Sequence, residues 1–473
     1  MIEVIGGPDR DRTDDLFHAI DPTVGFSTTY KTPVAPQVLV STYNPENQRI
    51  AKRIAFSRSK IGQFWCRNLV FPTLDAPSQT QSTAASSVAY AANPRDPYAQ
   101  SAHMLNAELQ FELNAANRPS ATREIVVDGR RLEVTPVFDT YWRFACQRQE
   151  AYFRRLDHQW PYTSDPILSE FKFTNAYRAA DRTSQYLIRN VIYADDRPFS
   201  AEDLFFRILL FKFFNKIETW ELLRSRLGDI SFKSYRFDVY DSIFNEALER
   251  KDRIYSAAYI MPSGGPGGEA RKHRTHLRLL EHMMEDKLPG QIARCKNMEQ
   301  AFSLLRAYPT LGDFLAYQFV TDFNYSELCD FTEAEFVAAG PGAHDGLRKC
   351  FPRADRAESS RLIRLMYEMQ EERFAEHGST FRSLWGRKLQ LIDCQNLFCE
   401  VDKYSRVAHP EIEGISGRTR IKQVFRPRGD MPIPFFPPKW GINDRIVASG
   451  IAAMRRYSPG RLTNANVFEI RSH

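Results

Sequence analysis

The sequence predicts a mainly α-helical protein that begins with a disordered leader. From about residue 140 onward, apolar residues recur at helical spacing. Hydrophobic residues make up 43% and aromatic residues 13% of the 473 residues, which is enough for sizeable cores. By contrast, 73–101 is rich in Ser, Thr, Ala, Gln and Pro and shows little hydrophobic periodicity. We therefore expect the folded part of the chain to follow the first hundred residues.

The leader, 1–103, has an unusual opening. Its first residues include GGPDRDRTDDLFHAI, which resembles the peptide produced when a stable-RNA gene region is misread as coding sequence. No methionine occurs between Met1 and Met104. We therefore expect the native chain to start near Met104. The alternative is a genuine but flexible leader.

Helices are expected in succession from residue 141 onward. The first covers 141–156, where aromatic residues and arginines recur at helical spacing. Asp165-Pro166 supplies the next helix start, because Pro fits the first helical turn. A long amphipathic helix is expected over 171–193. Further helices are expected at 201–227, 237–250, 271–286, 296–307, 312–323, 357–376 and 383–404.

These elements divide the chain into four regions. They are a leader at 1–103, a short lead-in at 104–137, a helical domain at 138–427 and a proline-rich, basic tail at 428–473. A short extended stretch is expected at 255–261. The proline-rich 426–440 cannot form a regular helix.

Charge and cysteine usage exclude several protein classes. The most apolar run, 204–214, is short and is interrupted by Arg207 and Lys212, so we expect no membrane span. The seven cysteines are irregularly spaced without a CxxC motif, which disfavours disulfides and zinc and favours the reducing cytoplasm. Between 401 and 473, 13 Lys and Arg stand against 6 Asp and Glu. This excess fits a polyanionic partner or a solvated basic surface.

A polar stripe is expected on the helix predicted over 171–193. Its members fall within an arc of roughly 80° on a helical wheel. They are Asn175, Arg178, Arg182, Gln185 and Arg189. Arginines one turn apart suit phosphate binding, and Asn or Gln can bond a base edge. The alternative is an ordinary solvated face.

The segment 308–322, YPTLGDFLAYQFVTD, is expected to join two helices by a tight turn. Pro309 and Gly312 permit such a turn, and N–H groups at the following helix start can bind a DNA phosphate. The segment resembles the helix-hairpin-helix of base-excision DNA glycosylases. That resemblance makes Asp322 a candidate catalytic carboxylate, although it lies nearer to the turn than the family usually places its aspartate. The alternative is a simple helical hairpin in which Asp322 is a capping residue.

A second glycine-containing segment, GPGAHDGLRKC, covers 340–350. Gly340 and Gly342 flank a proline, and a basic stretch with Arg348 and Lys349 follows. Gly342 is therefore a candidate for a phosphate-binding turn. The alternative is a loop between helices with an ordinary helix cap.

A polar row is expected on the helix that carries DCQNLFCEVDKY, 393–404. Its members are Asp393, Asn396, Glu400 and Lys403, again within roughly 80° of one another. Apolar side chains flank the row, so we expect it to be partly buried. Its carboxylates suit general base chemistry or a Mg²⁺ ion. The alternative is a surface helix with a Glu400–Lys403 pair worth a few tenths of a kcal/mol.

Several enzyme motifs are absent from the sequence. It contains no P-loop, no protein-kinase signature set, no HExxH and no G-x-S-x-G. The Gly-rich 263–273 lacks P-loop spacing and is interpreted as a flexible surface loop. ATP and Mg²⁺ are therefore expected only if a nucleotide binds in an unfamiliar way.

The helical segments together resemble one family. They are 171–193, 257–262, 308–322, 340–351, 393–404 and 417–422. They look like the helical domain of the 5-hydroxymethyluracil DNA kinase family, which is grouped with the alpha-glutamyl/putrescinyl-thymine pyrophosphorylases. The resemblance covers roughly 138–427. It implies action on hypermodified thymine in DNA, on a scaffold similar to helix-hairpin-helix glycosylases.

The leading hypothesis is a DNA-modifying enzyme that transfers or displaces a phosphoryl-type group at the hydroxymethyl oxygen. Asp393 and Glu400 are the candidates for acid–base or metal chemistry. Lys403 and Arg418 are expected to stabilise phosphate charge.

DNA is the expected partner, held by Arg178, Arg182 and the turn at Gly312. Two alternatives remain open. One is a DNA glycosylase with Asp322 as its catalytic carboxylate, and the other is a DNA-binding protein without catalytic activity.

Overall fold

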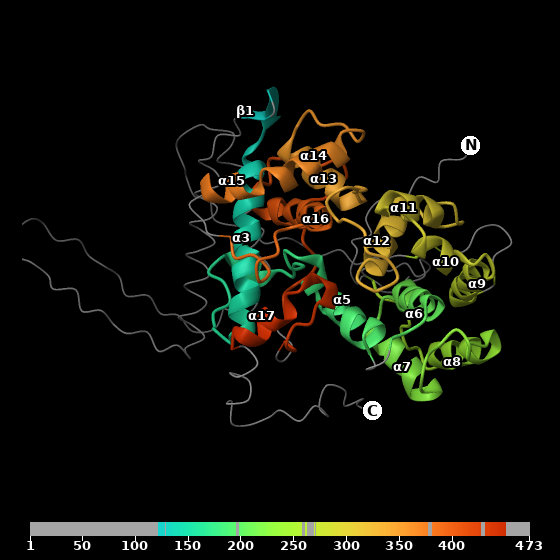
Figure 1. Cartoon of the computed structure of the whole chain (residues 1–473). Helices are drawn as coiled ribbons and strands as arrows, with labels where there is room; N and C mark the ends of the chain where they lie inside the picture. The colour runs from blue at the N-terminus through green and yellow to red at the C-terminus, as the bar shows by residue number, and fades with distance from the viewer. Residues whose placement is uncertain are drawn as a thin grey trace, which may run out of the picture. The chain divides into compact units, whose positions relative to one another are not determined.

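The described part of the chain is mainly helical, as the sequence predicts (Figure 1). The computed structural model describes residues 122–450 except 128, 195–197, 258–260, 263–268, 270, 377–380 and 427–430. All of these residues belong to one compact unit. The predictions for 1–103 and for a start at Met104 lie outside the described residues. Within the described ranges, no helix combines the length and the apolar character that a membrane span requires.

The described chain begins with an antiparallel hairpin inside the predicted lead-in. Its strands are β1 (Arg123–Val127) and β2 (Arg130–Val134), with Ile125 paired to Leu132. The helical elements that follow are α3 (Pro136–Leu156), α4 (Pro166–Glu170), the 3-10 turn η2 (Arg178–Ala180), α5 (Arg182–Tyr186), the π-helical η3 (Leu187–Ile192), α6 (Ala201–Phe214), α7 (Ile217–Leu227), α8 (Phe237–Glu249) and α9 (Lys272–Glu285).

The rest of the described chain is also helical, with longer irregular connections. Its elements are α10 (Leu288–Ala293), α11 (Met298–Arg306), α12 (Asp313–Phe323), α13 (Pro341–Cys350), α14 (Ser359–Glu368), α15 (Gln370–Glu376), α16 (Leu391–Ala408), the 3-10 turn η4 (Pro438–Trp440) and α17 (Asn443–Ala448).

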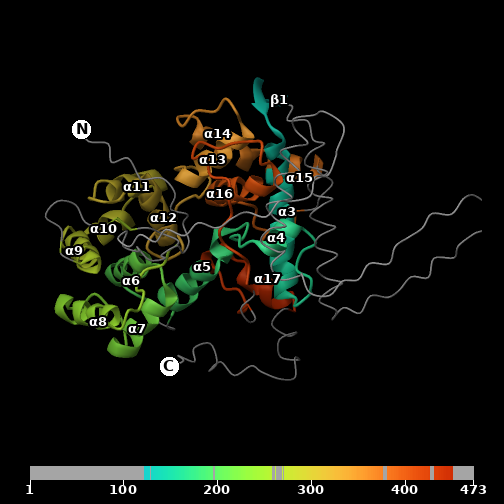
Figure 2. The same ribbon diagram turned by 180° about the vertical axis from the view of Figure 1, so that it is seen from behind.

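The helices α3, α13 and α16 pack on one another and form one part of the core. Thr135 caps α3 by accepting the Val137 N–H at 3.1 Å, and Pro136 occupies the first turn. Tyr141 of α3 packs on Phe398 of α16 with ring centroids 4.7 Å apart. Both views show α3 and α16 side by side (Figures 1 and 2).

The helix α6 forms a second part of the core with α9, α10 and α12. Its apolar side chains are buried on nearly all sides, which explains the long apolar run in the sequence. Phe205 stacks on Phe323 of α12 with centroids 4.9 Å apart. Arg207 is buried as well, and its Nη1 donates to the Ile230 carbonyl at 2.7 Å.

Most of the predicted helices are confirmed. Those predicted over 141–156, 237–250, 271–286, 296–307 and 312–323 correspond to α3, α8, α9, α11 and α12. The predicted start at Asp165-Pro166 is confirmed as well, because Asp165 accepts the Leu168 N–H at 2.8 Å and caps α4.

Two predicted helices are each divided in two. The helix predicted over 201–227 breaks at Asn215, whose φ of 47° lies in the left-handed region and ends α6. The helix predicted over 357–376 breaks at Met369, the C-cap of α14. In both places the apolar pattern continues across the break, so periodicity alone does not show it.

The helix predicted over 383–404 begins later, at Leu391, and continues to Ala408. Its start is set by a capping box in which the Asp393 carboxylate accepts the Gln390 N–H at 2.9 Å.

The long helix predicted over 171–193 is wrong. Only η2, α5 and η3 are helical, and 172–177 has no regular structure. Polar side chains compete with the helix: Asp181 accepts the Asn175 N–H at 2.7 Å, and the Asn175 amide donates to the Ala180 carbonyl at 2.7 Å. The predicted polar stripe therefore does not share one helical face.

The remaining local predictions are tested only in part. The described residues of 426–440 contain no regular helix apart from the single turn η4, as predicted. The predicted extended stretch at 255–261 includes 258–260, which lie outside the described residues. Most of the Gly-rich 263–273 also lies outside the described residues.

Candidate functional site

The candidate site is built around 173–181, here called the braced loop. Side chains of α3 and α16 hold its backbone. The Arg148 guanidinium of α3 donates to the Thr174 carbonyl at 2.8 Å and to the Asn175 side-chain oxygen at 2.6 Å. Glu400 of α16 accepts the Thr174 N–H at 3.0 Å. A segment without regular structure is thus fixed at several points, which suits a site that must hold its geometry.

Asp181 forms a hydrogen bond within the braced loop. Its carboxylate accepts the Asn175 N–H, as described above. Burial raises the pKa of Asp181 to about 7, although that N–H and the Arg148 guanidinium oppose the shift. Burial also lowers the pKa of Arg148 to about 10. The loop is therefore stabilised by a carboxyl group that changes charge near neutral pH.

We predict that Asp181 makes stability depend on pH. Its folded pKa of about 7 lies above the ordinary value of 3.8, so the folded protein binds the proton more tightly. The resulting stability is fully present below about pH 4 and is lost as pH rises to about 7. The wild type should lose this stability as the pH rises from 5 to 8, and Asp181→Asn should not. Urea unfolding should therefore show the variant becoming more stable relative to the wild type as the pH rises.

A matched control for this prediction is Asp444→Asn, because the Asp444 side chain is exposed. The control should track the wild type at both pH values. A difference between Asp181→Asn and the wild type that stays constant from pH 5 to pH 8 would contradict the prediction.

Asp393 joins α16 to the braced loop. Its two oxygens accept the Arg178 N–H at 2.8 Å and the Gln390 N–H at 2.9 Å. Burial raises the pKa of Asp393 to about 7, and these two N–H groups oppose the shift while Glu333 adds to it. Only 4% of the residue is exposed. The geometry suits positioning of the loop, and both oxygens are already engaged.

Glu400 and Lys403 lie nearer to solvent than Asp393. Glu400 bonds Lys403 at 2.8 Å, and their side chains are 12% and 17% exposed. The Lys403 ammonium also lies 4.6 Å from the centre of the Phe173 ring. The predicted partial burial of this polar row is thus observed. Glu400 and Asp393 of this row accept hydrogen bonds directly from the backbone N–H groups of 174–178. No base therefore fits between Asp393 and Arg178.

Asp322 and Arg178 form a buried ion pair beneath the braced loop. Asp322 is fully buried on α12, 2.8 Å from the Arg178 guanidinium and 3.3 Å from the Lys212 ammonium. Arg178 also donates to the Gln318 side chain at 2.8 Å. The expectation that Arg178 faces DNA is corrected, because only 2% of it is exposed. Asp322 likewise has no access to a substrate in this structure.

The other predicted stripe residues point to different places. Gln185 exchanges hydrogen bonds with the Phe435 backbone at 2.9 and 3.1 Å. Arg189 donates to the Ile433 carbonyl at 2.7 Å. These two side chains thus hold the proline-rich segment against η3. Arg182 remains largely exposed, with Glu218 3.8 Å away.

Gly342 is not in a turn. It lies inside α13 and is buried, and a Cβ there would come within 3.1 Å of the Cys399 sulfur. Gly346, one turn later, is tighter still, because a Cβ would lie 2.0 Å from the Phe398 carbonyl oxygen. The interpretation of Gly342 as a phosphate-binding turn is corrected. These glycines let α13 approach α16 closely.

The predicted helical hairpin at 308–322 is present as α11, a short turn and α12. Gly312 is exposed at the N-cap of α12, with open space beside it. Asp313 follows it and pairs with Arg306 at 2.5 Å. An acidic residue at the helix start competes with a phosphate for the same N–H groups. Phosphate binding at Gly312 stays a prediction.

Arg418 lies in an irregular segment that follows α16. Asp345 fixes the start of this segment by accepting the Ser416 N–H at 2.7 Å and the Ser416 hydroxyl at 2.6 Å. Arg418 is half-buried. Its predicted contact with phosphate is compatible with this position.

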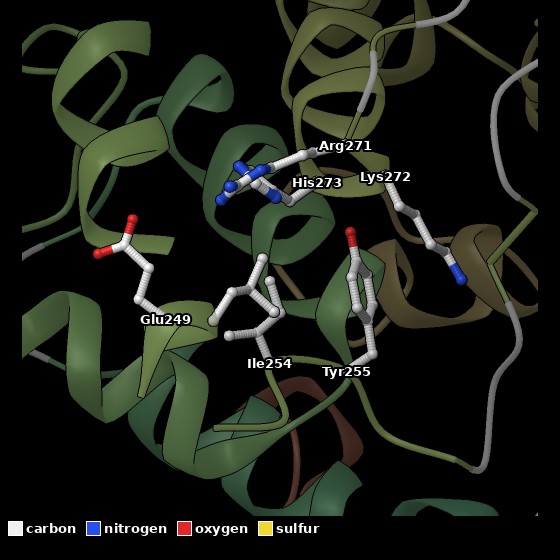
Figure 3. Close-up of a pocket in the computed structure, with 7 residues that line it drawn as sticks. Glu249, Ile254, Tyr255, Arg271, Lys272 and His273 are labelled. Atoms are coloured by element: carbon white, nitrogen blue, oxygen red, sulfur yellow. The ribbon is translucent and has the colours of Figure 1, made fainter. Parts of the chain in front are cut away.

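A pocket of about 410 Å³ lies between α8 and α9, and no predicted site residue lines it (Figure 3). Its walls include Ile254, Tyr255, Arg271, Lys272 and His273. Arg271 donates to Asn245 at 2.6 Å, and His273 bonds Asp241 at 2.8 Å. The Lys272 ammonium lies over the Tyr255 ring, 4.7 Å from its centre. The side chains of Arg271, Lys272 and His273 are thus already engaged within the protein, and we assign the pocket no ligand.

The described residues contain no group of three or more His, Cys, Asp or Glu side chains arranged to hold a metal ion. For Asp393, both carboxylate oxygens already accept backbone N–H groups. The predicted Mg²⁺ ligands Asp393 and Glu400 would therefore need water and substrate oxygens to complete a coordination shell.

The sequence interpretation missed Arg148 and Asp181, which brace the loop. Arg148 lies on the predicted helix 141–156, and the sequence pattern does not show which segment its long side chain contacts. Asp181 was detectable, because Asn and Asp close together in a polar stretch often bond their own backbone.

The fold and site together define a mainly helical domain with a loop braced by buried carboxyls. A family model described as "5-hmdU DNA kinase, helical domain" matches 135–414. The chain belongs to this family. The match includes α3, the braced loop and α16.

One curated relative is the 5-hmdU DNA kinase of Bacillus phage SP10. It is 22% identical over 288 residues, which cover 57% of this chain and 45% of the relative. The chain thus matches less than half of the length of that relative. No solved structure matches the chain.

Proposed function

We propose that this chain recognises 5-hydroxymethyluracil in DNA and takes part in phosphoryl transfer to its hydroxymethyl oxygen. The family match over 135–414 carries this proposal, because it covers α3, the braced loop and α16. The SP10 phage relative is named as a kinase of 5-hmdU in DNA.

The chemistry requires access to the modified base. The base must leave the duplex stack, which costs a few kcal/mol, and contacts to the DNA backbone offset that cost. The hydroxymethyl oxygen then attacks the γ-phosphorus of ATP. One O–P bond forms, the bond to ADP breaks, and the hydroxyl proton passes to a carboxylate.

Glu400 is our candidate proton acceptor, because it is less buried than Asp393 and lies at the edge of the braced loop. Lys403 beside it supplies positive charge for a phosphate. Asp393 is a positioning residue, which fixes the loop through the Arg178 N–H. Arg182, Arg418 and the turn at Gly312 are the proposed contacts to the DNA backbone.

The test is mass spectrometry of nucleosides from 5-hydroxymethyluracil DNA incubated with the chain, with and without ATP and Mg²⁺. Phosphorylated 5-hydroxymethyldeoxyuridine is expected only when ATP is present. Glu400→Gln should reduce its formation by at least about 100-fold, the usual contribution of a general base. Gln can still accept the Thr174 N–H, so the fold should survive.

Glu372→Gln is the matched control, because Glu372 is exposed on α15 and lies outside the site. It should leave product formation unchanged. Equal activity of Glu400→Gln and the control would contradict the role of Glu400.

A second candidate function is recognition of the modified base without catalysis. Two observations favour it: the sequence has no P-loop motif, and the chain matches only 45% of the length of its kinase relative. It predicts selective binding of 5-hydroxymethyluracil DNA with no new nucleoside under any condition. A glycosylase function is not proposed, because Asp322 is fully buried between two cations.

A further inference from the structure

We infer that 418–426 and Trp160 form a binding surface for a single strand of DNA. The inference rests on the proposed function and adds the surface that would hold the strand next to an extruded base. The surface is called the basic strip below.

The basic strip is extended and shows one face to solvent. Exposure alternates strictly from Arg420 to Arg426, with every second residue exposed. The exposed residues are Arg420, Lys422, Val424 and Arg426. This period of two is that of an extended strand with one covered face. Cations at alternate positions are then spaced by roughly 6.6 Å.

The backbone of the basic strip is held in place by neighbouring elements. The Arg406 guanidinium of α16 donates to the Arg420 carbonyl at 2.9 Å. Beyond it, the Lys172 N–H donates to the Gln423 carbonyl at 3.0 Å, and the Phe425 N–H donates to the Glu170 carbonyl at 2.7 Å. These last two bonds tie the strip to the segment that leads from α4 into the braced loop (α4 is labelled in Figure 2).

Three arginines of the basic strip have no carboxylate partner in the described part of the chain. Among the described residues, none of the ion pairs involves Arg418, Arg420 or Arg426. Arginine side chains without carboxylate partners attract phosphate groups, and binding releases the counterions of the nucleic acid.

An exposed aromatic group is linked to the basic strip through a series of packed side chains. Trp160 is 72% exposed and packs edge-on against Tyr162, with centroids 5.0 Å apart. The Arg155 guanidinium lies 6.0 Å from the Tyr162 ring centre and 5.7 Å from the Phe425 ring centre. This chain of contacts connects Trp160 to the strip. Proteins bind single strands by combining exposed aromatic rings, on which bases stack, with cations that contact the phosphates.

A single strand fits this surface better than a duplex does, because stacking on Trp160 requires an unpaired base. Extrusion of a modified base opens the duplex locally and provides such a base. The strip would then hold the opened strand by its phosphates.

The test is the affinity of the full chain for single-stranded 5-hydroxymethyluracil DNA over a range of salt concentrations. Arg420→Ala/Arg426→Ala should bind more weakly and should flatten the slope of log K against log salt by about 1.4. Arg130→Ala/Lys233→Ala is the matched control, because both of these side chains are exposed outside the strip. The control should retain the wild-type affinity and slope.

Trp160 is tested separately. Trp160→Ala should bind the single strand roughly tenfold more weakly, while Trp160→Phe, which can still stack, should retain most of the affinity. Binding should quench tryptophan fluorescence in the wild type and do so less in both variants.

The possible failures are distinguishable. Strip and Trp160 variants that bind like the control, while the wild type still prefers 5-hydroxymethyluracil DNA, would overturn this surface alone. A wild type that binds neither single-stranded nor duplex DNA would overturn the proposed function together with this surface.

Discussion

Asp322→Ala is expected to lower the free energy of unfolding by about 3–5 kcal/mol. Asp322 is fully buried and is the carboxylate partner of both Arg178 and Lys212, at 2.8 and 3.3 Å. Those two cations are themselves buried, so the variant leaves positive charge inside the protein without its partner. Urea unfolding of the variant and the wild type measures the difference.

Asp313→Ala is the control on the same helix. Asp313 pairs with Arg306, but its side chain is 66% exposed. Surface pairs of this kind contribute about 0–1 kcal/mol, so the control should unfold close to the wild type. A loss at Asp322 no larger than the loss at Asp313 would show that the buried cluster does not hold α12 to the braced loop.

Gly346→Ala is expected to destabilise the protein by about 3 kcal/mol or more, because the added methyl group overpacks a close helix contact. A Cβ at this position would lie 2.0 Å from the Phe398 carbonyl oxygen and 2.7 Å from its carbonyl carbon. Backbone atoms cannot rotate away as a side chain can, so α13 and α16 must separate. Thermal and urea unfolding both measure the effect.

Gly290→Ala in α10 is the matched control. A Cβ there would meet only the end of the Arg294 side chain, at 3.4 Å. Ala is favoured over Gly in a helix by up to about 1 kcal/mol, so this variant should be equally or more stable than the wild type. If both variants behaved alike, the close approach of α13 to α16 would be refuted.

The sequence was informative where apolar periodicity was regular and helix ends were marked. The helices α3, α8, α9, α11 and α12 were predicted for this reason. Asp165 marked the start of α4, where its carboxylate caps the helix. The break at Asn215 was missed because the apolar pattern continues across it, although Asn is one of the few residues besides Gly that readily adopt the left-handed conformation.

The structure brings some of the predicted site residues together, but in a geometry that the sequence did not show. Asp393 and Glu400 contact the segment that contains Arg178. They meet its backbone, because the side chains of Asn175 and Asp181 stabilise a loop in place of a helix. The helical wheel was drawn for a helix that does not form. It therefore placed Arg178 on a face that binds DNA, whereas Arg178 is buried.

The glycines of α13 show a second limit of pattern reasoning. Gly340 and Gly342 were compatible with a turn, and Pro341 between them strengthened that interpretation. In the structure Pro341 occupies the first turn of α13, and Gly342 and Gly346 face α16. Only the packing partner distinguishes a glycine needed for close approach from one needed for a turn.

Selectivity for the modified base tests the central claim most directly. The measurement is competition between two duplexes of identical sequence, one with 5-hydroxymethyluracil and one with thymine, for the full chain at a single salt concentration. Phosphate contacts are the same in both duplexes, so any preference comes from the base. We predict that the hydroxymethyl duplex binds about tenfold more tightly, since one additional hydrogen bond to a hydroxyl is worth about 1 kcal/mol or more. Equal affinity for the two duplexes would contradict the proposal that this chain recognises 5-hydroxymethyluracil.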